Sequence, residues 1–179
     1  ERFGSGSKQL GINLSRKKAL IFSKNLDQPI FQEYITGKEI SIDVWISKTN
    51  KIKGMILRFR NLVIDGESKI STTFENIKIE KSIEKFVKKF KFKGFICIQG
   101  IIKNENEFKI IECNPRIGGA STLGIQKGLD GICWGILEAD GQNLKNYKFL
   151  KDKRKIKLIR YQKDKYIYGD NFWSRWYNL

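Results

Sequence analysis

The sequence has no histidine, only two prolines and three cysteines. Without histidine the chain cannot use imidazole for acid–base catalysis or bind a metal through it. Cys97, Cys113 and Cys133 are far apart, odd in number and surrounded by apolar residues. This pattern favours buried free thiols over disulfides or a zinc site.

Long hydrophobic runs and targeting signals are also missing. No apolar run approaches the roughly 18 residues that a membrane-spanning helix needs, and no secretory signal is visible. We therefore expect a cytoplasmic protein without membrane contact. Because the chain starts at Glu1 and not at a methionine, we expect it to be a segment of a longer protein.

Acidic residues are scarce, since 19 Asp and Glu stand against 35 Lys and Arg and the net charge is +16. Such a charge raises nucleic acid as a partner. The basic residues are spread among the predicted strands and helices, which is typical of solvated faces, so a nucleic-acid-binding domain is the less favoured alternative. With 40% hydrophobic residues, the chain can build a folded core.

Two apolar, β-rich runs at 95–102 and 108–113 flank a polar tip and predict a β-hairpin. Gln99, Glu112 and Asn114 interrupt these runs. Strand side chains alternate between faces, so Glu112 and Asn114 share one face. The strand register decides whether Gln99 joins them, and the sequence leaves that register open.

A carboxylate and two amide oxygens on one sheet face suit magnesium, which takes further ligands from water and substrate phosphates. Arg116 follows with a permanent positive charge, and Gly118, Gly119 and Ser121 let backbone amides approach an anion closely. Adjacent cation and anion sites suit a nucleoside triphosphate. The alternative interpretation is an interrupted edge strand, a proline turn and a glycine-rich helix entry.

Hydrophobic periodicity places the other elements. It predicts strands at 11–14, 30–35, 39–46, 51–60 and 67–74 and helices at 15–22, 76–90 and 125–137. The last helix should turn Ile125, Leu129, Ile132, Cys133 and Ile136 inward. Arg58 and Arg60 should be solvated on one strand face. Beyond Gly141 the chain is basic and aromatic, with strands expected at 155–161 and 166–168 and docking of 171–177 on the core.

Several motifs occur in a set order: Arg2-Phe3-Gly4-Ser5-Gly6-Ser7, Gln32-Glu33-Tyr34-Ile35-Thr36-Gly37-Lys38-Glu39, Ser41-Ile42-Asp43-Val44, Arg58-Phe59-Arg60, Asp65-Gly66-Glu67-Ser68, Gln99 in a strand and Glu112-Cys113-Asn114-Pro115-Arg116. Over about residues 1–140 this order resembles the ATP-grasp superfamily, close to its carbamoyl-phosphate-synthase-like carboxylate–amine ligase branch. The resemblance implies an α+β chain with the C-terminal portion of the ATP-grasp fold, an antiparallel sheet with flanking helices.

The resemblance also implies a role for each matching residue. Gln99, Glu112 and Asn114 would bind magnesium or manganese bridged to the ATP phosphates. Arg116 would stabilise the transferring phosphoryl group, and Arg60 would contact the acyl phosphate or its carboxylate. Ser5, Gly6 and Ser7 would form a mobile loop that covers the phosphates. Glu33, Tyr34 and Ile35 would contact adenine, and Glu39 would bind the ribose. Gly118, Gly119 and Ser121 would lie on the substrate side.

Two departures from the family pattern are visible. Gln99 stands where many members have an acid, and the phosphate-binding lysine that normally precedes the Gly/Ser loop is absent. By resemblance, residues 1–31 are the remainder of the small subdomain, 32–141 the C-terminal subdomain, and 142–179 a basic, aromatic extension packed on the core. The N-terminal domain would be a missing partner, so we expect this fragment alone to be inactive.

The sequence thus predicts part of an ATP-dependent ligase. It would activate a small carboxylate as an acyl phosphate for attack by an amine or ammonia. A non-catalytic, regulatory ATP-binding module of the same fold is the alternative. The identity of the two substrates and the oligomeric state, including a homodimer, are left open.

Overall fold

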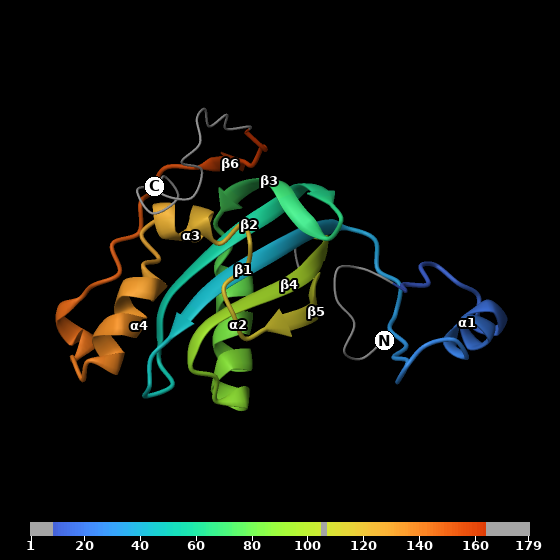
Figure 1. The fold of residues 1–179 in the computed structure, drawn as a ribbon, viewed down its shortest axis with the longest axis horizontal. Coiled ribbons are helices and arrows are strands. Elements are labelled where there is room, and N and C mark those ends of the chain that lie inside the picture. The colour runs from blue at the N-terminus through green and yellow to red at the C-terminus, as the bar shows by residue number, and fades with distance from the viewer. Residues whose placement is uncertain (1–8, 105–106, 164–179) are drawn as a thin grey trace, which may run out of the picture.

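The computed structural model describes residues 9–104 and 107–163. Within them a six-stranded antiparallel sheet runs in the order β5-β4-β1-β2-β3-β6 (Figure 1). The strands are β1 (Lys38–Ile46), β2 (Ile52–Ile64), β3 (Glu67–Phe74), β4 (Gly94–Asn104), β5 (Glu107–Asn114) and β6 (Lys157–Ile159). The helices are α1 (Arg16–Ser23), α2 (Ile77–Phe90), α3 (Thr122–Gln126), α4 (Gly131–Ala139) and the 3₁₀ turn η1 (Leu144–Asn146).

One face of the sheet is closed by α2. Apolar residues that alternate along β1, such as Ile42 and Val44, pack against Ile83 and Val87 of this helix. Asn76 caps α2 by accepting a hydrogen bond from the Ile79 amide at 3.1 Å, and Lys91 ends it in the left-handed conformation. Burial of this apolar stripe drives the helix onto the sheet.

The opposite face of the sheet is apolar at one end and polar elsewhere. At the apolar end, Trp45, Leu129 and Trp134 build a second cluster beneath α4, which lies beside the sheet (Figure 1). Further along the strands, the same face carries polar side chains of β1, β2 and β4. Asp43, Arg58 and Gln99 therefore lie on the face that α2 does not cover.

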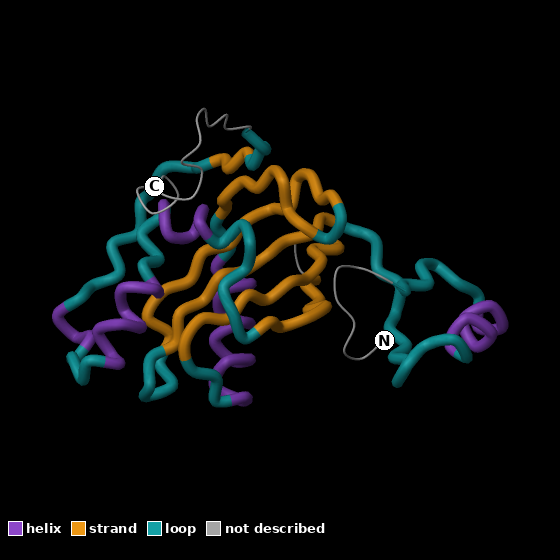
Figure 2. Tube along the Cα trace, viewed as in Figure 1, coloured by secondary structure: helices purple, strands orange, loops and turns teal. Residues whose placement is uncertain are grey.

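Most predicted elements are confirmed, including the hairpin and the helices at 15–22 and 76–90. The strands predicted at 11–14 and 30–35 are wrong, because the sheet edges are occupied by β5 and β6 and no described strand pairs with these segments. A lone strand leaves its backbone groups without partners, so it is not stable. Figure 2 shows residues 9–37 as loops and one helix beside the sheet.

The single helix predicted at 125–137 is two helices. Gly128 adopts a φ of +97°, and the Asp130 side chain caps α4 by accepting from the Cys133 amide at 3.2 Å. Leu129 is buried as predicted, but Ile132, Ile136 and Cys133 are exposed, because α4 meets the sheet with its Trp134 side instead. The break between the helices changes which face of α4 points inward.

Strand β6 pairs antiparallel with β3 through Ile70 and Ile159, so part of the basic C-terminal segment joins the sheet. The predicted strand at 166–168 and the aromatic segment 171–177 lie outside the described residues. Within the described ranges no helix has both the length and the apolar character to cross a membrane.

Candidate functional site

The three predicted metal-side residues meet at the end of the β4–β5 hairpin. The register pairs Gln99 with Glu112 and Cys97 with Asn114, and it shifts between Gln99 and Gly100. Both amides donate to the same Glu112 Oε1, Asn114 Nδ2 at 2.8 Å and Gln99 Nε2 at shorter range. The register that the sequence left open therefore brings Gln99, Glu112 and Asn114 together on one face; we call them the oxygen cluster.

The oxygen cluster has the chemistry of a hard-cation site with little negative charge. Glu112 is exposed, and Gln99 and Asn114 are half-buried, so water can reach them. In residues 9–104 and 107–163 no group of three His, Cys, Asp or Glu side chains could hold a metal. These residue types suit magnesium bound through one carboxylate and two amide oxygens, with phosphate and water as the other ligands, although both amides turn their nitrogens toward Glu112 in this structure.

Cys113 lies between Glu112 and Asn114 but takes no part in the oxygen cluster. It packs against the core on the α2 side. Burial, together with the neighbouring Glu112 charge, raises the pKa of the Cys113 thiol to about 11. The thiol is therefore protonated at neutral pH.

Glu39 and Arg60 form an ion pair on the same face. Arg60 Nε lies 2.8 Å from Glu39 Oε1, and Arg60 Nη2 donates to the Gly66 carbonyl at 3.0 Å. The Arg60 side chain is only 7% exposed, so the expectation that it is solvated is wrong. The ion pair holds this arginine between β1 and the β2–β3 turn.

Arg116 follows the oxygen cluster directly. Its amide donates to the Asn114 carbonyl at 2.8 Å, and its exposed guanidinium donates to the Ile117 carbonyl at 3.1 Å. A second guanidinium lies close by, because a Cβ added at Gly119 would stand 3.1 Å from Arg160 Nη1. The loop 117–121 is thus flanked by the guanidinium groups of Arg116, just after β5, and of Arg160, just after β6.

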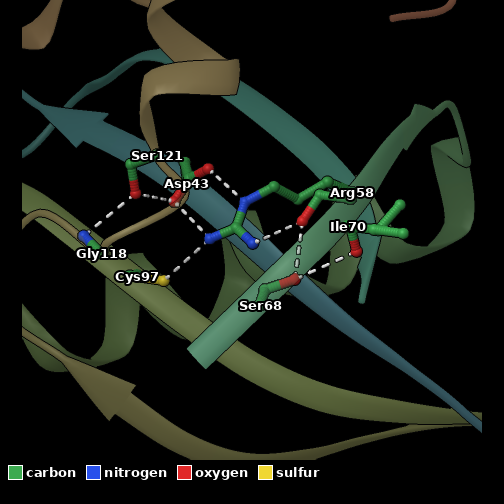
Figure 3. Close-up of polar contacts among 8 residues, drawn as sticks. Asp43, Arg58, Ser68, Ile70, Cys97, Gly118 and Ser121 are labelled. Atoms are coloured by element: carbon green, nitrogen blue, oxygen red, sulfur yellow. Dashed lines mark hydrogen bonds and ion pairs between the residues drawn. The ribbon is translucent and has the colours of Figure 1, made fainter. Parts of the chain in front are cut away.

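A buried polar cluster lies beneath this loop (Figure 3). Arg58 Nε donates to Asp43 Oδ2 at 2.8 Å, and Arg58 Nη2 approaches Asp43 Oδ1 at 3.4 Å. The Ser121 hydroxyl donates to Asp43 Oδ1 and accepts from the Gly118 amide at 3.0 Å. Asp43 is 0% exposed and Arg58 2% exposed, so the expectation of a solvated Arg58 is wrong.

The charges in this buried cluster are balanced. Burial lowers the pKa of Arg58, but its attraction to Asp43 outweighs burial and leaves the pKa above the usual value. Burial and then the Asp43 charge raise the pKa of the Cys97 thiol to about 12. The sequence analysis included Asp43 in a motif but gave it no role, although an acid between Ile42 and Val44 of an apolar strand is a signal for a buried partner.

The described nucleotide-side residues lie just before and at the start of β1. Glu33, Tyr34 and Ile35 lie in the irregular segment before β1, where Glu33 and Tyr34 are exposed and Ile35 is half-buried. Glu39 shares the sheet face of Gln99, because Ser41 pairs with Gln99 and stands two residues from Glu39. Ser5, Gly6 and Ser7 lie outside the described residues.

Three solved structures with the same fold are larger than this chain. The biotin carboxylase from Campylobacter jejuni, in a beta-gamma-ATP complex, matches with a TM-score of 0.53 and 17% identity over 63% of this chain and 27% of that chain. N5-carboxyaminoimidazole synthetase from Staphylococcus aureus matches with a TM-score of 0.51 and 21% identity over 64% and 33%.

A third structure is the biotin carboxylase domain of the Hydrogenobacter thermophilus 2-oxoglutarate carboxylase, in complex with MgADP, ADP and bicarbonate. It matches with a TM-score of 0.54 and 18% identity over 64% of this chain and 27% of that chain. The chain thus spans a third or less of each of these three structures. At sequence identities of 17–21%, these matches establish the shared fold alone.

No curated protein sequence matches the chain. A protein family does match, over residues 25–163, and this range includes β1 to β6, the oxygen cluster and the buried cluster. The motifs, the antiparallel sheet and the structural neighbours agree with this match. The chain therefore belongs to the ATP-grasp family described as "ATP-grasp in the biosynthetic pathway with Ter operon".

Proposed function

We propose that this chain is the ATP- and magnesium-binding part of a carbamoyl-phosphate-synthase-like ATP-grasp ligase. The enzyme would join a carboxylate to an amine or ammonia at the expense of ATP. The observation that carries the proposal is the oxygen cluster, in which Gln99 and Asn114 converge on Glu112 beside the positive charge of Arg116. Complexes of two structural neighbours, one with beta-gamma-ATP and one with MgADP, support a nucleotide at this fold.

The nucleotide would lie along the polar face of the sheet. Glu39 would accept hydrogen bonds from the ribose hydroxyls, and the segment with Glu33, Tyr34 and Ile35 would contact adenine. Ser5, Gly6 and Ser7 would cover the phosphates with backbone amides. Gln99, Glu112 and Asn114 would hold magnesium, which supplies charge neutralisation to the phosphate oxygens when bound.

The reaction would proceed in two displacements. A carboxylate oxygen attacks the γ-phosphorus, the bond from that phosphorus to the β–γ bridging oxygen breaks, and ADP leaves. The amine nitrogen then attacks the acyl carbon, inorganic phosphate leaves with its bonding electrons, and the nitrogen loses a proton. Arg116 and Arg60 would stabilise the charge on the transferring phosphoryl group and on the carboxylate. No covalent link to the protein is needed, which suits a chain without histidine.

The proposal extends to the whole protein. An N-terminal domain of the same protein would complete the nucleotide site, the present chain alone would be inactive, and the setting would be the cytoplasm. A non-catalytic ATP-binding module is the second candidate, and the observation that favours it is the single carboxylate in the oxygen cluster. A site with one acid holds magnesium more weakly than a site with two.

The test is ADP release by the full-length natural protein, measured with panels of small acids and amines. Glu112→Ala should lower turnover by at least about 100-fold, because it removes the only carboxylate of the cluster. Glu107→Ala is the matched control, since Glu107 lies on the same strand and contacts Lys103 and Lys109 instead. Unchanged turnover in Glu112→Ala would refute the metal assignment, and magnesium-dependent ATP binding without turnover under any condition would favour the non-catalytic module.

A further inference from the structure

The loop 117–121 is tied to the sheet through the buried cluster beneath it. We propose that Asp43, Arg58 and Ser121 are positioning residues that hold this loop in place for the carboxylate or acyl phosphate. The inference rests on the proposed function, because it assigns the loop to the same substrate. It changes the expected role of Ser121, whose hydroxyl would act through the loop and not touch the substrate.

The burial of the cluster argues against a simple contribution to stability. Asp43 and Ser121 are 0% exposed and Arg58 is 2% exposed. Desolvating an ion pair costs about as much as the pair returns, and apolar residues of similar volume are often as stable or more so. An ion pair at this place is therefore better explained by what it orients than by what it contributes to folding.

The hydrogen bonds lead from the sheet to the loop without a gap. Arg58 on β2 fixes the Asp43 carboxylate on β1, and Asp43 Oδ1 accepts from the Ser121 hydroxyl. The same hydroxyl accepts from the Gly118 amide at 3.0 Å, and the Ser121 amide donates to the Gly118 carbonyl at 3.0 Å. The loop is thus closed on itself and fastened to the sheet by one side chain.

Packing brings the loop backbone onto the cluster. A Cβ at Gly118 would stand 3.1 Å from both Cys97 Sγ and Ser121 Oγ, closer than most such contacts. A Cβ at Gly124, on α3, would stand 3.4 Å from Asp43 Oδ2. Glycine at 118 therefore permits the close approach, and the Asp43 carboxylate lies under both the loop and the helix that follows it.

The far side of Arg58 offers a control within the same cluster. Arg58 Nη1 lies 3.5 Å from Ser71 Oγ, and Ser71 shares a 2.8 Å hydrogen bond with Ser68 on β3. Ser71→Ala removes a buried hydroxyl from the same guanidinium but does not touch the loop. Comparison of Ser121→Ala with Ser71→Ala separates the positioning of the loop from the general loss of a buried hydrogen bond.

The experiment uses the full-length natural protein and measures two affinities by calorimetry. The first is that of MgADP, and the second is that of inorganic phosphate for the protein saturated with MgADP. Ser121→Ala should weaken phosphate binding about fivefold to tenfold, as expected for a misplaced group of loop amides, and leave MgADP affinity within about twofold. Ser71→Ala should leave both affinities unchanged. Gly118→Ala, which changes no polar group, should act in the same direction as Ser121→Ala.

The outcomes separate this inference from the proposed function. If the unmodified protein does not bind MgADP, the proposed function fails and the inference with it. If MgADP binds normally and phosphate does not bind, or if Ser121→Ala and Ser71→Ala change phosphate affinity equally, the inference alone is overturned. Loss of phosphate affinity confined to the two loop variants would support it.

Discussion

Glu39 and Arg60 neutralise each other across neighbouring strands, with Glu39 Oε1 2.8 Å from Arg60 Nε. In the proposed function each of them makes a separate contact, Glu39 with the ribose and Arg60 with the acyl phosphate. Under the proposed function, this ion pair would couple the ribose contact to the acyl phosphate contact. Removing the charge of one partner should therefore change the affinity of the ligand that the other partner binds.

Glu39→Gln tests this coupling. The change keeps the shape of the side chain but replaces a charged acceptor with a neutral amide, so we expect adenosine to bind about tenfold more weakly. Phosphate should bind as well as before or better, because Arg60 loses its counter-charge. Fluorescence or calorimetric titrations with each ligand would measure the two effects. Equal adenosine affinity in both proteins would contradict the ribose assignment.

Asp43→Ala should strongly destabilise the fold. The substitution leaves the buried Arg58 charge without its carboxylate, which typically costs about 3–5 kcal/mol. Removing both charges in Asp43→Leu/Arg58→Met should cost less than Asp43→Ala alone, because neither charge is then buried unpaired. Urea unfolding would measure the free energies. A double variant less stable than Asp43→Ala would show that the pair is required for folding itself.

Stability should fall above the ordinary thiol pKa. Burial raises the pKa of Cys97 from 9.0 to about 12, so between these values the folded state holds a proton that the unfolded state has released. The contribution of the protonated thiol is fully present below pH 9 and is lost progressively as the pH rises to about 12. The difference in unfolding free energy between the natural protein and Cys97→Ala should shrink by up to about 1.4 kcal/mol per pH unit in that window. A difference that does not change with pH would contradict the raised pKa.

Gly128→Ala should separate steric from conformational cost. Gly128 and Gly141 both have positive φ, +97° and +79°, but a Cβ at Gly128 would stand 2.3 Å from the Leu150 carbonyl oxygen while Gly141 has open space. Gly141→Ala should therefore cost only about 1 kcal/mol, for the backbone conformation. Gly128→Ala should cost clearly more, because the backbone of the 150–151 segment must move. Thermal unfolding would rank the two, and equal costs would refute the close approach.

The fold was largely predictable because its signals are local. The alternation in 39–46 and the helical stripe of 76–90 depend on residues close in sequence, and the structure confirms the elements that they predict. The prediction of one helix at 125–137 failed because Gly128, with its positive φ, divides that segment. The prediction of a strand at 30–35 failed because a strand requires a pairing partner, which hydrophobic periodicity does not reveal.

The sequence by itself determined the residue types of the site: one acid, two amides and an arginine at the end of a hairpin. Only the tertiary structure decided that Gln99 faces Glu112, since a shift of one residue in the register would have turned it to the α2 side. Only the tertiary structure decided that Arg58 is buried on Asp43 while Arg60, two residues away, pairs with Glu39. Burial and pairing are set by which strands become neighbours, and that is a property of the whole sheet and not of any short stretch of chain.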